Sequence, residues 1–192
     1  MGLEAKKFAT YEDLLNVPDH LIGEIIAGEL IVSPRPGPHH THTSSSLIGD
    51  LQGPFQKGKG GPGGWWIYYE PEVHLREDVL VPDICGWRKD LFPHPPIEES
   101  YYNFAPNWVC EILSPSTFRV DRVQKLSIYL REKVDHIWFI DPVAMTLEVL
   151  ERKDNRWMIA ATHAGNTLVR AAPFEAIEID LGSLWLPESK ST

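Results

Sequence analysis

Two acidic residues lie inside apolar, strand-like segments of the chain, where an unpaired charge is costly. Glu111 stands in the run Trp-Val-Cys-Glu-Ile-Leu, and Asp83 stands in the run Val-Leu-Val-Pro-Asp-Ile-Cys. A buried carboxylate needs a cation or hydrogen-bond donors, and two carboxylates about 4 Å apart repel by roughly 4 kcal/mol at an effective dielectric near ~20. A divalent ion would turn that repulsion into binding, and hard oxygen ligands without a Cys or His cluster favour Mg²⁺ or Mn²⁺ over zinc. The alternative is that each acid caps a turn or pairs with a nearby arginine.

Lys125 is the candidate positive partner of these acids. It lies on a helix predicted over residues 118–133, where Asp121, Lys125 and Tyr129 share one face at i, i+4 and i+8. A lysine near a metal-bound water can orient that water or stabilise a developing negative charge. The alternative, which the spacing alone favours, is a solvent-exposed face with an ordinary i,i+4 ion pair. We expect the buried stripe of this helix to consist of Val123, Leu126 and Leu130.

Three histidines, His39, His40 and His42, lie close together at the start of another predicted helix. Residues spaced by one and two positions do not bring three imidazoles to one point on a helix, so we do not expect a zinc site. We expect His40 alone to lie near a phosphate or a carboxylate. The alternative is a surface histidine.

The segments around these residues predict strands and helices in alternation. Residues 108–113 and 136–140 are short apolar runs, which are typical of strands covered on both faces. Residues 65–75 and 79–87 are rich in aromatic and β-branched side chains and predict a hairpin with its turn at 76–78. The other predicted elements are a helix from Thr10 to Val17, a hairpin of residues 24–26 and 30–32, a helix over 39–52 on which His40, Leu47 and Leu51 share a face, a helix cap at 114–117, a β-meander of 146–151 and 156–160, and a segment over 174–186 packed along a sheet edge.

The composition is that of an ordinary globular protein and predicts a single domain over residues 1–192, with 43% hydrophobic and 23% charged residues. The net charge of −9 argues against a protein that coats nucleic acid through bulk electrostatics, but a local basic strip and a metal ion could still serve a nuclease. Cys85 and Cys110 are expected to be core thiols. Since no run of about 18 apolar residues occurs, we expect a cytoplasmic protein without a membrane span.

The order of several short motifs resembles the Uma-two family of restriction-endonuclease-like proteins, over roughly residues 8–186. The motifs are Gly23-Glu24-Ile-Ile-Ala-Gly28-Glu-Leu-Ile-Val-Ser-Pro34, then His40 with Leu47 and Leu51, Val-Pro-Asp83-Ile, Glu111-Ile-Leu-Ser-Pro-Ser-Thr117, Asp121 with Lys125 and Tyr129, and Ile137-Trp-Phe-Ile-Asp-Pro142.

This resemblance implies an α/β fold with the PD-(D/E)XK nuclease core, a mixed sheet flanked by helices, here with extra β-hairpins. It matches Asp83 to the Asp of the PD element and Glu111 to the second acid. The chain departs from the superfamily at Leu113, where the catalytic lysine would stand; in the family that lysine lies on the following helix, as Lys125 here. Glu24 and His40 match further polar positions near the pocket.

Together these observations predict Mg²⁺-dependent (or Mn²⁺-dependent) hydrolysis of DNA phosphodiester bonds. Asp83 and Glu111 would hold the metal, with Glu24 completing its coordination directly or through water, and Lys125 would position the attacking water or offset charge. The predicted phosphate contacts are His40, Lys57, Lys59, Arg119 and Arg122.

Two other functions fit the same residues. The chain could be a nuclease-fold module that binds nucleic acid or protein without catalysis, or it could hydrolyse another phosphate ester, such as a nucleotide. A homodimer is expected for an enzyme that cuts both strands, and Trp157 and Trp185 could belong to its interface or to the core.

Overall fold

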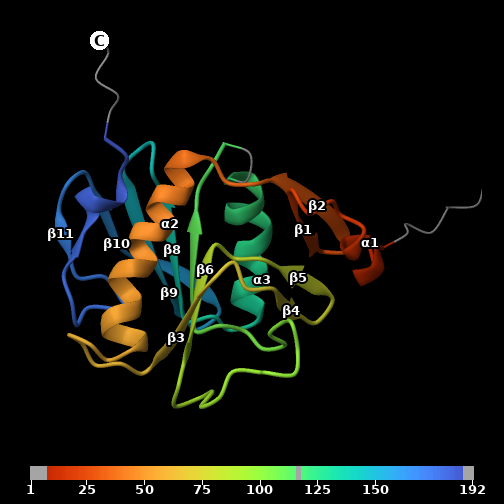
Figure 1. The fold of residues 1–192 in the computed structure, drawn as a ribbon, viewed down its shortest axis with the longest axis horizontal. Coiled ribbons are helices and arrows are strands. Elements are labelled where there is room, and N and C mark those ends of the chain that lie inside the picture. Colours follow the sequence, from red (N-terminus) through yellow and green to blue (C-terminus); the bar gives the residue numbers. More distant parts are fainter. Residues whose placement is uncertain (1–7, 116–117, 188–192) are drawn as a thin grey trace, which may run out of the picture.

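A six-stranded mixed sheet forms the centre of the fold in the computed structural model, which describes residues 8–115 and 118–187 (Figure 1). Its strands lie in the order β10-β9-β8-β7-β6-β3; β7 and β8 run parallel, and the other neighbours pair antiparallel. The two parallel strands are the predicted apolar runs, and layers of structure cover both of their faces. The strand bounds are β3 Trp65–Tyr69, β6 Ile84–Arg88, β7 Trp108–Ile112, β8 His136–Asp141, β9 Thr146–Lys153 and β10 Arg156–Ala164.

A smaller four-stranded sheet, in the order β2-β1-β5-β4, lies beside the large one (Figure 1). The hairpin predicted over residues 65–87 is confirmed at its turn, but each arm bends midway and serves both sheets. Pro71 and Pro82 stand at the bends, where a residue without an N–H cannot extend a ladder. The bounds are α1 Tyr11–Leu15, β1 Leu21–Ile26, β2 Glu29–Pro34, β4 Val73–Leu75 and β5 Asp78–Leu80.

Helix α2, Pro38–Leu51, covers one face of the large sheet (Figure 1). Its buried side carries His40, Leu47 and Leu51, as predicted from their spacing. The helix continues into a π-helical turn, η1 Gln52–Gln56.

The C-terminal segment packs on this same face, so the edge position predicted for residues 174–186 is wrong. The ring of Phe174 is fully buried and meets the rings of Trp108 and Trp138 edge-on. Burial and edge-on contacts with other rings stabilise a large aromatic side chain, and this face of the sheet provides both. The segment contains β11 Leu168–Val169, β12 Ile179–Asp180 and the 3₁₀ turn η3 Leu181–Leu184.

The opposite face of the large sheet is covered by a helix that begins as π-helix η2, Val120–Lys125, and continues as α3, Leu126–Arg131. This confirms the predicted helix, but the predicted apolar stripe is wrong at Val123, which is 63% exposed, while Leu126 is partly buried against the core. The buried side of the helix consists instead of Asp121, Lys125, Ile128 and Tyr129. The cap predicted at Ser116 and Thr117 lies outside the described residues.

The alternation of side chains along β7 explains why a polar stripe is buried there. Trp108 and Cys110 point to the α2 side and join its apolar cluster, whereas Val109 joins the cluster on the α3 side. Because successive strand residues face opposite ways, Glu111 also faces the helix that carries Lys125. Cys85 and Cys110 are buried free thiols, as predicted.

The fold is therefore the predicted one, a mixed sheet flanked by helices with additional β-hairpins. Trp185 belongs to the core on the α2 side, and Trp157 packs on the other core while its indole N–H donates to the Leu126 carbonyl. No helix in the described ranges has the length and apolar character needed to cross a membrane.

Candidate active site

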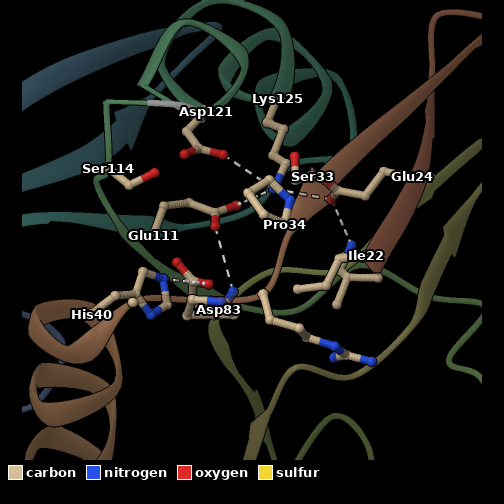
Figure 2. A pocket seen from close by; sticks show the side chains of 14 residues that line it. Ile22, Glu24, Ser33, Pro34, His40, Asp83, Glu111, Ser114, Asp121 and Lys125 are labelled. Atoms are coloured by element: carbon tan, nitrogen blue, oxygen red, sulfur yellow. Dashed lines mark hydrogen bonds and ion pairs between the residues drawn. The ribbon is translucent and has the colours of Figure 1, made fainter. Parts of the chain in front are cut away.

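Glu111 lies at the carboxyl end of β7 and is 1% exposed. Its Oε1 atom accepts a hydrogen bond from the Tyr129 hydroxyl at 2.6 Å and lies 3.4 Å from Lys125 Nζ. Two donors from one helix thus hold a carboxylate that the strand places away from water. This contact fixes one oxygen of Glu111 and leaves the other, Oε2, directed toward Asp83 (Figure 2).

Asp83 follows the bend at Pro82 and lies directly beside Glu111. Its Oδ2 atom accepts from the Ile112 N–H at 2.7 Å, and its own N–H points to Glu111 Oε2 at 3.4 Å. On the other side, His40 Nε2 lies 2.9 Å from Asp83 Oδ1. Since β6 and β7 are neighbours in the sheet, the pairing of these strands brings together two acids that are 28 residues apart in the sequence.

Lys125 holds three carboxylates at once. Its Nζ lies 3.0 Å from Glu24 Oε1, 3.1 Å from Asp121 Oδ1 and 3.4 Å from Glu111 Oε1, and its side chain is only 4% exposed. Glu24 comes from β1 of the small sheet and also accepts from the Val81 N–H at 2.7 Å. Lys125 therefore joins the small sheet, the helix and the large sheet at one point.

A single pocket of about 190 Å³ opens onto these side chains (Figure 2). One water needs only ~10–15 Å³ by this kind of measure, so the pocket has room for a hydrated ion and part of a substrate. Its wall combines the β1–β2 hairpin, the connector from β2 to α2, and the ends of β6 and β7. The charged and titratable residues in its lining are Glu24, Arg35, His40, Asp83, Glu111, Asp121 and Lys125.

Comparisons with known proteins identify the family and the fold of this chain. The sequence of residues 8–182 matches the Uma2 family, which is described as "Putative restriction endonuclease". The chain belongs to the Uma2 family. The crystal structure of a putative nuclease belonging to DUF820 from Anabaena variabilis is 21% identical, covers 92% of this chain and 97% of its own, and superposes with a TM-score of 0.71. No curated protein matches the sequence.

Burial dominates the electrostatics of this Uma2 site. Desolvation raises the pKa of Glu111 well above its usual value, with Lys125 opposing the shift and the neighbouring acids adding to it. Burial also raises the pKa of Glu24. Desolvation lowers the pKa of Lys125, but the surrounding carboxylates outweigh it and the net pKa lies well above its usual value, so the amine stays protonated. Four acids around one buried ammonium therefore oppose the ionisation of Glu111 and Glu24.

The oxygen donors of the Uma2 pocket fit a hard divalent cation bound by two protein carboxylates. Asp83 and Glu111 are adjacent, and Glu111 Oε2 accepts a long contact of 3.4 Å from the Asp83 N–H. Within residues 8–115 and 118–187, no three His, Cys, Asp or Glu side chains already form a closed metal cage. Mg²⁺ does not need one, because it keeps several waters and often takes only one or two carboxylates. Glu24 contacts Lys125 instead, and its ligand role stays a prediction.

All seven site residues predicted from the sequence meet at this pocket. Asp83, Glu111, Lys125, Glu24, His40 and Asp121 line it, and Tyr129 supports Glu111 from behind. The structure does not bring the predicted basic strip to it. Lys57 and Lys59 follow η1 at the far end of α2, a 14-residue helix about 21 Å long, and Arg122 pairs with Glu148. Arg35 also lines the pocket but is not predicted from the sequence, because no periodic pattern marks it in the proline-rich run Pro34-Arg-Pro-Gly-Pro38.

Proposed function

We propose that this Uma2 chain is a metal-dependent endonuclease that hydrolyses DNA phosphodiester bonds. The observation that carries the proposal is the meeting of Asp83, Glu111 and Lys125 in one pocket. Asp83 and Glu111 would hold Mg²⁺ or Mn²⁺, which supplies an acidified water and polarises the phosphate oxygens. The crowding of four acids around one ammonium supports this assignment, since a divalent cation would stabilise their ionised forms.

Lys125 supplies the fixed positive charge of the reaction centre. Its ammonium is held between Glu24 and Asp121, at 3.0 and 3.1 Å, which sets its position against Glu111. Because the amine is preorganised and screened from water, it offsets negative charge that develops on the phosphate without first shedding a hydration shell. It also replaces the superfamily lysine that is missing at Leu113, whose side chain is 6% exposed and lies in the core.

His40 and Tyr129 act as positioning residues. His40 Nε2 at 2.9 Å fixes one oxygen of Asp83, and the Tyr129 hydroxyl at 2.6 Å fixes one oxygen of Glu111. The second oxygen of each acid accepts from a backbone N–H, Asp83 Oδ2 from Ile112 and Glu111 Oε2 from Asp83, so both carboxylates are fixed and a metal ion would bind their remaining lone pairs. The His40 contact argues for a role through Asp83 rather than the phosphate contact expected from the sequence.

The experiment is a cleavage assay on supercoiled plasmid, single-stranded DNA and RNA, with Mg²⁺, Mn²⁺ or EDTA. We expect nicking or linearisation that requires the metal and is lost in Glu111→Gln. Cleavage of RNA alone, or turnover only on a panel of small phosphoesters, would overturn the DNA assignment in favour of another phosphodiester or phosphate ester. Light scattering in the same buffer tests the expected homodimer.

A nuclease-fold binding module is the second candidate, and the net charge of −9 favours one that binds protein, because phosphate backbones are repelled at long range. Calorimetric titration with Mn²⁺ separates the two. Binding of Mn²⁺ that Glu111→Gln abolishes, without turnover of any nucleic acid, supports the module. Binding together with turnover supports the enzyme.

A further inference from the structure

The charges in the pocket leave an anionic strand with little to bind. Lys125 is 4% exposed and already contacts three carboxylates, so it cannot reach a phosphate that lies outside the reaction centre. The predicted lysines of the glycine-rich loop lie at the far end of α2. Yet a chain with a net charge of −9 needs a local cation to hold a nucleic acid strand against repulsion.

Arg35 is the lining residue that meets this need. It lies in the connector between β2 and α2, and its side chain is 54% exposed while it still lines the pocket. Pro34 and Pro36 flank it and restrict the backbone of the connector through their fixed φ angles. The charged group is therefore carried on a stiff segment at the mouth of the pocket.

The guanidinium is held in place by a backbone carbonyl and by one long ion pair, and neither uses all of its donors. Arg35 Nη2 donates to the Asp19 carbonyl at 2.8 Å, and Nη1 lies 3.6 Å from Glu70 Oε2. A carbonyl carries no net charge, and 3.6 Å is longer than a good charge-assisted hydrogen bond. A guanidinium has five N–H donors in a planar fork that matches phosphate oxygens, so exposed donors stay available for a ligand.

Arg35 also stands on a border between two hollows. It lines the pocket of the reaction centre and a neighbouring hollow of about 310 Å³, whose wall includes Asp19, Glu70 and Glu72. Both hollows contain carboxylates, but among the described residues Arg35 is the only cation in the lining of the second hollow, whereas Lys125 also lines the pocket of the reaction centre. Arg35 is therefore the exposed cation at the border through which a strand would enter the pocket.

We propose that Arg35 binds the backbone phosphate that neighbours the scissile one and thereby sets the position of the strand over Asp83 and Glu111. This inference rests on the proposed function, because it assumes that the pocket cleaves a nucleic acid. In this role Arg35 is a substrate-binding residue that raises the affinity for the strand and does not contact the reacting atoms.

Arg170 provides a matched control for this residue. Its side chain is also 54% exposed, its Nη1 donates to the Glu175 carbonyl at 2.9 Å, and its Nε lies 3.9 Å from Glu178 Oε1. It follows β11 and is not part of the pocket lining. Replacing either arginine by alanine removes the same charge and similar local contacts. A difference between the two variants therefore reports on the pocket.

The test compares Arg35→Ala, Arg35→Lys and Arg170→Ala with the parent protein. The affinity for a fluorescein-labelled single-stranded DNA 20-mer is measured by anisotropy in Ca²⁺ at several salt concentrations, and kcat and KM are measured in Mn²⁺. Arg35→Ala should bind about tenfold more weakly, with the salt slope reduced by about 0.7. KM should rise with kcat within about twofold of the parent, Arg35→Lys should recover part of the affinity, and Arg170→Ala should match the parent.

Two different failures can be told apart. If the parent cleaves DNA and Arg35→Ala keeps its affinity and KM, or Arg170→Ala loses as much, the role of Arg35 is overturned while the proposed function stands. If the parent neither binds nor cleaves the strand, the proposed function fails, and the Arg35 inference fails with it.

Discussion

The two ends of the parallel pair β7 and β8 carry the same kinds of side chain in opposite electrostatic settings. At the amino ends, Arg152 pairs one-to-one with Asp135 at 2.8 Å, and both side chains are partly exposed. At the carboxyl ends, Lys125 is buried among several acids. A partly exposed, balanced pair costs little to form and contributes little, whereas a buried and unbalanced cluster is expensive. This is the difference expected if the carboxyl end carries the proposed chemistry and the amino end serves packing.

The largest expected effect is on turnover at the carboxyl end. Asp83→Asn and Glu111→Gln should each lower the proposed metal-dependent cleavage by roughly 10³-fold or more, because each would remove a charged ligand of the proposed metal ion and a preorganised part of the site. Circular dichroism should show an unchanged fold. Asp135→Asn at the amino end should cleave at the parent rate, and equal losses at both ends would remove the basis for separating them.

The second largest difference between the two ends should be in their contribution to the free energy of unfolding. Lys125→Met should destabilise the protein by about 3–5 kcal/mol, because it leaves Glu24, Glu111 and Asp121 buried without a cation. Arg152→Met should cost about 1 kcal/mol or less, since its pair is partly exposed. Urea denaturation followed by tryptophan fluorescence measures both, and similar costs for the two variants would contradict the comparison.

The dependence of stability on pH sharpens the contrast further. Burial raises the pKa of Glu111 above its unfolded value, so the folded state favours the neutral acid. The stability linked to this proton is complete below the unfolded pKa of about 4.5 and is lost as the pH rises through the raised folded pKa. In EDTA, Glu111→Gln should therefore gain in Tm over the parent as the pH is raised from about 4 to about 8.

The control for this pH series is again at the amino end. Asp135→Asn loses an ion pair with Arg152 and should not gain in Tm over the parent as the pH rises. A Tm difference between Glu111→Gln and the parent that stays constant, or shrinks with rising pH, would show that Glu111 is charged in the free protein. Lys125 would then stabilise the charged Glu111 carboxylate more strongly than we expect from a lysine that is shared among several buried acids.

The sequence predicted the carboxyl end better than it predicted the packing around it. Acids within apolar runs, such as Glu111, are informative because burial of a charge has few explanations. The four-residue spacing from Asp121 to Lys125 and Tyr129 predicted a shared face correctly. The spacing does not show that this face is buried. A polar helix face that packs against an acid of a sheet has the same sequence pattern as a polar face that points to solvent.

Long-range contacts account for the other differences. The segment over residues 174–186 mixes acids with apolar residues, and this pattern predicts an edge position. Only the aromatic cluster around Phe174 shows that the segment covers a sheet face. Arg35 has no periodicity to mark it, since it stands in a proline-rich connector. Its position beside Asp83 and Glu111 depends on the pocket that three segments distant in the sequence form around it.

The smallest expected effect belongs to His136, at the amino end of β8. Burial lowers the pKa of its imidazole below 6.5, because the charged form is poorly solvated there. The stability linked to the neutral ring is complete above the unfolded pKa of about 6.5 and is lost as the pH falls through the lowered folded pKa. Partial exposure and solvent screening keep the effect small, so His136→Gln should flatten the acid side of the Tm profile by only about 1–2 °C. Cleavage at neutral pH should match the parent, since His136 lies at the end of β8 away from Asp83 and Glu111; a large loss of turnover in this variant would mean that the amino end also contributes to the reaction.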